Sequence, residues 1–274
     1  MIPILNNSIG ALPGLDLQTS IEVIAQFLFS SLRIGAFLLA SPLFGAKFVL
    51  LPVRIAIAMV ITLMVFAINP VMPNIQTIAS INGIVIAATE IGIGLTAGLV
   101  LTIIFSAVGL AGEKIAASSG LSMAQQVDPT SGTSSPVVSQ ILTLFMLVVF
   151  LSFDGHLVAV RTLIESYRHL PIGSFPNPET LIQSGILASE TMFFAAAVIM
   201  LPIVIILLLI NVAIGVVTRS APTLNLFSFG FPITMLGVFF MLYISAGPIA
   251  LALSNLADEA IYFMQDTLGA LTDG

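Results

Sequence analysis

Two apolar runs, residues 81–111 and 185–218, constrain the fold of this chain more than any other feature. A helix that crosses the hydrocarbon core of a bilayer needs roughly 20 apolar residues, because that core is about 30 Å thick. As helices, runs of 31 and 34 residues would reach roughly 46–51 Å. We therefore expect the long helices of this chain to tilt, to lie partly outside the bilayer, or to kink. The candidate kink positions are Pro202, Pro232 and Pro248.

Four further apolar segments bring the expected number of hydrophobic helices to about six. They cover residues 21–41, 49–68, 137–153 and 223–253. Only 7% of the residues are charged and 58% are hydrophobic, whereas a soluble domain carries about 25% charged residues. The sequence therefore predicts an all-α protein that is integral to a membrane or belongs to an apolar assembly.

The composition of the sequence argues against several classes of function. It has no cysteine and only two histidines, so neither a thiolate site nor a histidine-based metal site is expected. Its net charge of −6 gives no electrostatic reason to bind nucleic acid. It also carries no P-loop, zinc-protease or serine-hydrolase motif. We expect no enzyme activity and no cofactor.

Glu90 interrupts the apolar run 81–111, and Gly92, Gly94 and Gly98 follow it. Glycines at this spacing flatten one face of a helix and allow another helix to approach closely. A carboxylate inside an apolar helix is costly and marks a functional or interface position. The sequence leaves two interpretations open for Glu90: a proton relay, or a carboxylate satisfied by an arginine or by backbone donors within an assembly.

Three arginines, Arg33, Arg54 and Arg219, lie within or beside apolar segments. One interpretation is that they pair with carboxylates of neighbouring chains. The other is that they stabilise the C-terminal ends of helices, where a cation suits the helix dipole. The sequence favours neither interpretation.

The central stretch 109–136 is rich in glycine and serine and interrupts the apolar pattern. Its backbone polar groups would lack partners in lipid, so it must lie in water, against protein, or along a water-filled passage. A surface loop uses such residues, and by composition alone this is the favoured interpretation. The alternative is a loop that closes a pore, with Met123 as a flexible apolar seal.

Six motifs, taken in order and spacing, make the chain resemble the FliR/SctT family of type III secretion export-gate proteins. They are LRIGAFLLASPLFGAKFVLLPVRIAIA (32–58), TEIGIGLTAGLV (89–100), GEKIAASSGLSMAQQVDP (112–129), FLSFDGHL (150–157), LPIG (170–173) and RSAPTLNLFSFGFP (219–232). The family often has asparagine where this chain has Asp154. That carboxylate is expected to pair with Arg161 or to cap the following helix.

The resemblance implies a single export-gate domain over residues 1–274, built of long helical hairpins. A FliP-like part (1–180) would precede a FliQ-like hairpin (181–274). The chain would assemble with FliP and FliQ into a closed helical gate in the bacterial inner membrane and flagellar basal body. Unfolded flagellar proteins would pass through its channel, and FlhB and FlhA are further expected partners.

The resemblance also implies a plug loop over residues 111–127. Its expected gate residues are Gly112, Ser118, Ser119, Gly120, Leu121 and Met123. The residues expected to hold helices and subunits together are Arg33, Arg54, Glu90, Gly92, Gly94, Gly98 and Arg219. Two rival hypotheses remain: a proton-coupled small-solute transporter with Glu90 as the proton site, and a scaffold that never lines the channel.

Overall fold

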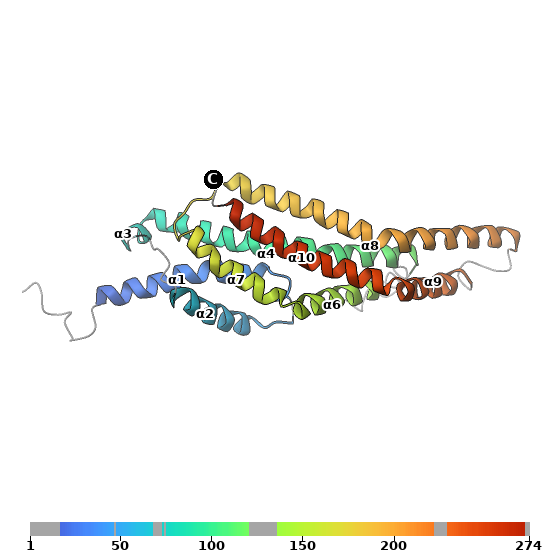
Figure 1. The fold of residues 1–274 in the computed structure, drawn as a ribbon, viewed down its shortest axis with the longest axis horizontal. Coiled ribbons are helices and arrows are strands. Elements are labelled where there is room, and N and C mark those ends of the chain that lie inside the picture. The colour runs from blue at the N-terminus through green and yellow to red at the C-terminus, as the bar shows by residue number, and fades with distance from the viewer. Residues whose placement is uncertain are drawn as a thin grey trace, which may run out of the picture. The chain divides into compact units, whose positions relative to one another are not determined.

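The computed structural model describes residues 17–46, 48–67, 73, 75–120, 136–221 and 229–271, and these ranges contain helices and turns but no strand. The all-α prediction is confirmed. The helices in chain order are α1 (Leu17–Ala40), α2 (Leu51–Ala67), α3 (Ile75–Ile78), α4 (Ile81–Ser118), α6 (Val137–Ser152), α7 (Gly155–His169), α8 (Pro178–Ser220), α9 (Phe231–Ile244) and α10 (Ala246–Ala270) (Figure 1).

Both long apolar runs form helices that extend beyond the runs themselves. The run 81–111 lies within α4, which has 38 residues, and the run 185–218 lies within α8, which has 43. The start of α8 is fixed locally, because the Asn177 side chain accepts a hydrogen bond from the backbone N–H of Glu179 at 3.0 Å. A side-chain acceptor of this kind is a typical helix N-cap.

The last apolar run, 223–253, does not form one helix. The chain bends by 63° between α9 and α10, and α10 continues through the acidic tail to Ala270. Pro248 has no N–H to donate to the carbonyl of Ile244, so the helical hydrogen bonds cannot run through this point. Pro232 lies in the first turn of α9, where proline is tolerated, and Pro202 lies inside α8 without ending it.

The chain forms two compact units whose segments alternate along the sequence. Unit 1 contains residues 1–99, 160–183 and 265–274, and unit 2 contains residues 100–159 and 184–264. The division at residue 180 into a FliP-like and a FliQ-like part stays a prediction.

In unit 1, α1 packs against α2, and the first part of α4 also packs against α1 (Figure 1). The core of the unit contains Ile34 and Phe37 of α1, Val65 of α2, Ile93 of α4 and Leu163 of α7, all buried. These side chains are apolar, but a fully buried arginine, Arg33, lies among them.

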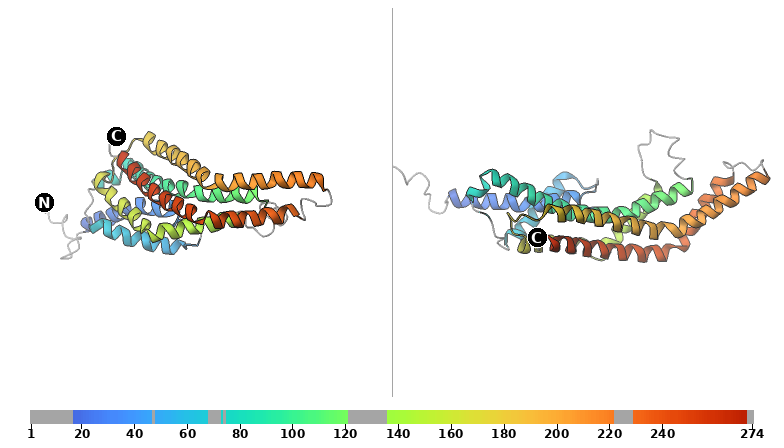
Figure 2. Two further views of the ribbon diagram at one scale, coloured as in Figure 1. Left: turned by 45° about the vertical axis from the view of Figure 1, so that its right-hand side comes forward. Right: turned by 90° about the horizontal axis from the view of Figure 1, so that it is seen from above.

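In unit 2, the second part of α4 packs against α6, and α8 lies beside α9 (Figure 2). The rings of Phe105 and Phe150 meet edge to face with their centroids 5.0 Å apart. Such an arrangement is favourable for aromatic pairs. Gly237 of α9 lies against the side chain of Ile210 of α8, and the absence of a side chain at this glycine allows the two helices to approach.

Three helices of the described part of the chain, α1, α4 and α8, are long and apolar enough to cross a membrane. The number rises to five if the bent pairs α6–α7 and α9–α10 each count as one span. Large apolar side chains are exposed on all of these long helices; Phe194 of α8, for example, is 72% exposed. This surface is consistent with a membrane-embedded protein.

Candidate functional site

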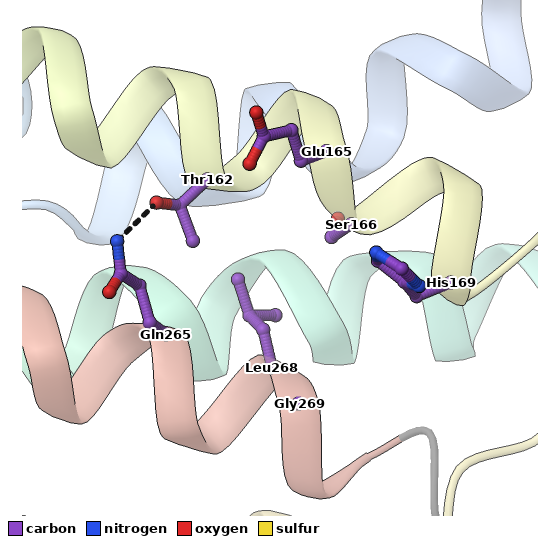
Figure 3. Close-up of a pocket in the computed structure, with 7 residues that line it drawn as sticks. All are labelled: Thr162, Glu165, Ser166, His169, Gln265, Leu268 and Gly269. Carbon is purple, nitrogen blue, oxygen red and sulfur yellow. Dashed lines mark hydrogen bonds between the residues drawn. The ribbon is translucent and has the colours of Figure 1, made fainter.

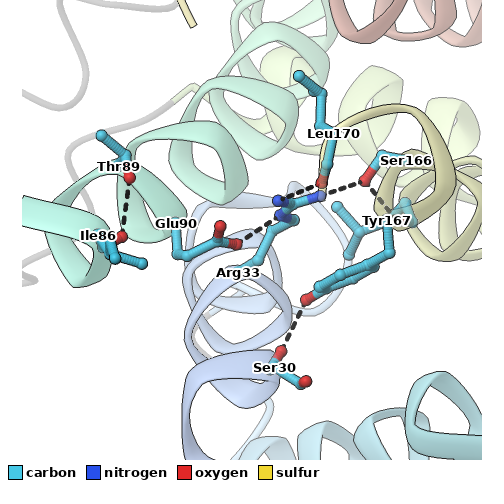
Figure 4. A network of polar contacts seen from close by, with 9 residues as sticks. Ser30, Arg33, Ile86, Thr89, Glu90, Ser166, Tyr167 and Leu170 are labelled. Carbon is cyan, nitrogen blue, oxygen red and sulfur yellow. Dashed lines mark hydrogen bonds and ion pairs between the residues drawn. The ribbon is translucent and has the colours of Figure 1, made fainter. Parts of the chain in front are cut away.

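A buried polar cluster surrounds Arg33 in unit 1 (Figure 4). The Arg33 side chain on α1 has no exposed surface, and neither does that of Glu90 on α4. Arg33 Nε donates to Glu90 Oε2 at 2.8 Å. A cation and a carboxylate that would each be costly alone in an apolar core therefore compensate each other.

Three more partners of the guanidinium come from the end of α7. Arg33 Nη1 donates to Ser166 Oγ at 3.0 Å, and Nη2 donates to the carbonyl oxygen of Leu170 at 3.0 Å. The guanidinium carbon lies 4.2 Å from the ring centroid of Tyr167, within the range of a cation–π interaction. The Tyr167 hydroxyl in turn donates to the carbonyl oxygen of Ser30 at 2.6 Å.

We call Ser30, Arg33, Glu90, Ser166, Tyr167 and Leu170 the Arg33 cluster. It joins α1, α4 and the C-terminal end of α7 through side chains that lie far apart in the sequence. Arg33 has a carboxylate partner within its own chain, so it does not need a carboxylate of a neighbouring chain, and its role in subunit packing stays a prediction. Glu90 Oε1 makes no hydrogen bond of ordinary geometry, but the backbone N–H of Gly173 also interacts with the carboxylate.

The glycines that follow Glu90 differ in their surroundings. A Cβ atom at Gly94 would lie 2.1 Å from the carbonyl oxygen of Arg33, and one at Gly98 would lie 2.7 Å from the Cβ of Ala40. Both positions therefore require glycine for the close approach of α4 to α1. A Cβ atom at Gly92 would meet nothing within 4 Å. The role of all three in subunit packing stays a prediction.

The other two arginines do not join the Arg33 cluster. Arg54 Nη2 donates to the carbonyl oxygen of Ala46 at 2.6 Å and to that of Gly45 at 3.2 Å, so it stabilises the turn that follows α1. Arg219 is exposed in the last turn of α8, where a cation suits the helix dipole. Any role of these two residues in holding subunits together stays a prediction.

The expected gate residues that are described lie near the C-terminal end of α4 in unit 2. A Cβ atom at Gly112 would lie 2.4 Å from the Cα of Ser139 on α6. Ser118 is half-buried, Ser119 is buried, and Gly120 has a φ of +79°. Two further gate residues, Leu121 and Met123, lie outside the described residues, as does all of the expected plug loop after residue 120.

The turn between α6 and α7 explains the residue type at position 154. Asp154 has a φ of 55°, a left-handed conformation in which aspartate and asparagine are the best tolerated residues after glycine. The proposed pairing of Asp154 with Arg161 is not present, because Arg161 Nε donates to Glu165 Oε1 at 2.8 Å. The backbone conformation therefore accounts for the residue type at this position, and the expected cap of α7 by the Asp154 carboxylate stays a prediction.

A surface pocket in unit 1 lies between α7 and the end of α10 (Figure 3). Its volume is about 410 Å³, and Gln265 Nε2 lies 3.4 Å from Thr162 Oγ1 at its edge. Its lining is Thr162, Glu165, Ser166, His169, Gln265, Leu268 and Gly269. Among the described residues, no group of three or more histidine, aspartate or glutamate side chains is placed to hold a metal ion.

Sequence reasoning missed two sets of residues that the structure brings into these sites. Ser166 and Tyr167 of α7, and Leu170 just beyond its end, surround Arg33. Only the helical spacing of Arg161 and Glu165 in this segment indicated that the opposite face of the helix is buried. Asn211, which donates a hydrogen bond to the carbonyl oxygen of Ser118 at the end of α4, was missed as well. It is the single strongly polar residue in an apolar stretch of α8, and that isolation was a usable signal.

The sequence was compared with known protein families and with curated proteins. Residues 24–260 match the model of the family described as bacterial export proteins, family 1. The chain is 34% identical over 212 residues to the flagellar biosynthetic protein FliR of Pectobacterium carotovorum, covering 77% of this chain and 80% of that protein.

Other relatives extend the similarity. The FliR protein of Escherichia coli is 34% identical over 205 residues, which are 74% of this chain and 77% of the relative. The FliR protein of Bacillus subtilis is 28% identical over 255 residues, 92% of this chain and 98% of the relative. The matched segments contain both the Arg33 cluster and the end of α4. The chain therefore belongs to the FliR family of bacterial export proteins.

Proposed function

We propose that this chain is a subunit of the FliP–FliQ–FliR export gate of the flagellar type III secretion system and forms part of its channel. Membership of the FliR family supports a component of the flagellar export apparatus. The finer proposal places the chain in the inner membrane within the flagellar basal body, in contact with FliP and FliQ and near FlhB and FlhA. Its role there is non-enzymatic.

The main support for assembly with other subunits is the length of the exposed apolar surface on α8. Large apolar side chains are exposed from Ile186, at 64%, to Val216, at 62%. Thirty residues separate these positions, which corresponds to about 45 Å along a helix. A bilayer core of about 30 Å would cover this length only at a tilt of about 50°, beyond the 0–40° range of membrane helices. This length supports the proposal that protein covers part of this surface.

Mass measurement of the co-expressed proteins tests this proposal. The chain is expressed with FliP and FliQ of the same organism and purified in detergent. We expect a single complex that contains several copies of the partners. If FliP and FliQ purify together while this chain runs as a monomer, the assembly proposal is wrong.

Cross-linking gives a matched control, because the chain has no cysteine of its own. Leu209 on α8 is 64% exposed, whereas Leu207, two residues away, is fully buried. A cysteine in place of Leu209 is expected to cross-link to a partner subunit, and one in place of Leu207 is not. Equal yields from the two positions would contradict a specific interface on this face of α8.

The channel role needs a separate test, since a scaffold would assemble in the same way. We place the end of α4, with Gly112 and residues 118–120, beside the path of the exported chain. A cysteine in place of Ser118 is expected to cross-link to an export substrate stalled by a tightly folded domain. The same substrate without its export signal is the control. A cross-link yield no higher than that of the control would favour a scaffold.

The geometry of Glu90 counts against the rival transporter. A proton site needs a path to water, yet Glu90 has no exposed surface and is paired with Arg33 of its own chain. A transporter would lose uptake into liposomes in the Glu90→Gln variant. Our proposal expects no uptake by the isolated chain in the first place.

A further inference from the structure

Asn211 makes a contact that explains its presence in an apolar helix. Between Thr191 and Thr218 of α8 it is the one residue with an amide or charged side chain. Its Nδ2 donates to the carbonyl oxygen of Ser118 at 2.9 Å, across 93 residues of sequence. The amide is therefore not an isolated polar group in hydrocarbon. It binds the C-terminal end of α4, and both residues belong to unit 2.

Thr234 of α9 donates a hydrogen bond to the next carbonyl group, that of Ser119. Its Oγ1 lies 3.0 Å from the carbonyl oxygen of Ser119, across 115 residues of sequence. The same hydroxyl lies 3.0 Å from the carbonyl oxygen of Phe231 and 3.2 Å from that of Gly230. Since a hydroxyl has one proton to donate, Thr234 shares it between its own helix and the end of α4.

Several carbonyl groups at this helix end accept hydrogen bonds from groups that can be named. The last carbonyl groups of a helix lack partners within it. Those of residues 115 and 117 accept from the backbone N–H groups of Ser119 and Gly120, each at 3.2 Å. The carbonyl of residue 116 accepts from the Ser119 hydroxyl. Among these contacts, local groups donate to the carbonyl groups of residues 115–117, and side chains of α8 and α9 donate to those of residues 118 and 119.

The same helix end also has a packing contact with α9. Gly120 adopts a φ of +79°, and a Cβ atom there would lie 2.5 Å from the ring of Phe231. Glycine is needed both for the backbone conformation and for the close approach of the ring. Asn211, Phe231 and Thr234 therefore meet the last residues of α4 from two different helices.

We propose that Asn211 and Thr234 are positioning residues that fix the C-terminal end of α4 and the two residues after it, 118–120, through their hydrogen bonds to the carbonyl groups of Ser118 and Ser119. We call these five residues the α4 cap. The proposal itself concerns geometry, and its importance for export rests on the channel role proposed above. In this arrangement a shift of α8 against α9 changes the position of the end of α4.

The absence of native cysteine allows a direct test of the α4 cap. Ser119 is 1% exposed, and a Ser119→Cys substitution creates a single buried thiol of similar size. Its rate of reaction with N-ethylmaleimide is measured in membranes of cells that contain the whole export apparatus. Should that variant not accumulate, Ser118→Cys at the neighbouring half-buried position serves as the reporter.

Asn211→Leu and Thr234→Val each remove a donor while nearly keeping the side-chain size. Because one hydrogen bond is lost in each case, we expect labelling to be roughly three- to tenfold faster. Thr234→Ser keeps the hydroxyl and is expected to label at the original rate. Thr218→Val is the matched control, because the Thr218 hydroxyl bonds only carbonyl groups of its own helix among the contacts described.

The direction of the change in labelling rate in Asn211→Leu distinguishes a positioning role from a general effect on stability in the membrane. Leucine is more favourable than asparagine in a lipid-facing helix, so a residue without a positioning role would leave labelling and protein level unchanged or improved. Labelling in Asn211→Leu and Thr234→Val that is no faster than in Thr218→Val would overturn the α4 cap.

Secretion of flagellar proteins from the same strains is the second readout. We expect the faster-labelling variants to export less at equal protein level, and Thr234→Ser to export normally. Faster labelling with normal export would leave the α4 cap in place and refute the channel role of residues 118–120. The failure of the two proposals can therefore be told apart.

Discussion

Replacement of Arg33 by methionine is the sharpest perturbation of the Arg33 cluster. The substitution keeps a long flexible side chain but removes the guanidinium and its three hydrogen bonds. Glu90 then remains in the core with no cation within reach, since Arg33 is its ion-pair partner in the described part of the chain. The effect on folding depends mainly on this unpaired carboxylate.

The magnitude follows from the burial of both partners. Removal of one member of a fully buried ion pair costs about 3–5 kcal/mol, because the remaining charge is uncompensated. The hydrogen bonds to Ser166 and Leu170 and the contact with Tyr167 belong to the same cluster, so their loss is contained in this value and is not added. For a chain of this size we expect the midpoint of thermal unfolding to fall by roughly 10 °C.

The double variant Arg33→Met/Glu90→Leu distinguishes this cause from poor packing. Apolar residues of similar volume can replace a buried ion pair at little cost or with a gain. We expect the double variant to unfold within about 1 kcal/mol of the original chain, and therefore to be more stable than Arg33→Met alone. The assay is thermal unfolding in detergent, followed by helical circular dichroism.

The control is Arg161→Met, which removes an arginine that is 78% exposed in its pair with Glu165. An exposed pair contributes little, so we expect no measurable change in the unfolding midpoint. Two results would refute the reasoning. One is an Arg33→Met midpoint equal to that of Arg161→Met, and the other is a double variant less stable than Arg33→Met.

Three further predictions concern backbone geometry and use the same unfolding assay. Gly94→Ala is expected to destabilise by about 1–3 kcal/mol because its Cβ would meet the backbone of α1, whereas Gly92→Ala, in open space, gains about 0.5–1 kcal/mol. Gly120→Ala is expected to cost at least about 1–2 kcal/mol from its left-handed backbone, and an unchanged midpoint would contradict this. Asp154→Asn is expected to be neutral and Asp154→Val to cost about 1–2 kcal/mol; equal midpoints for these two would show that residue 154 is not constrained.

The sequence by itself determined the helices and many of their ends. An apolar side chain favours burial wherever it lies, and helix length and proline position are local properties, so the apolar runs predicted α1, α2, α4, α6 and α8. Pro248 was a predicted kink position, and the chain does bend there, because a missing N–H acts on its own helix. The motifs also identified the family, which the comparisons confirm.

The contacts between residues that lie far apart in the sequence were determined only by the tertiary structure. The partners of Arg33 lie 57, 133 and 137 residues away, and no local pattern states which helix face will approach another. For the same reason the sequence treated Gly92, Gly94 and Gly98 alike, although only the last two lie against α1. Hydropathy shows that a polar residue in an apolar helix needs a partner. Which partner it finds depends on how the helices pack. The role of Asn211 therefore became clear only from its hydrogen bond to the end of α4.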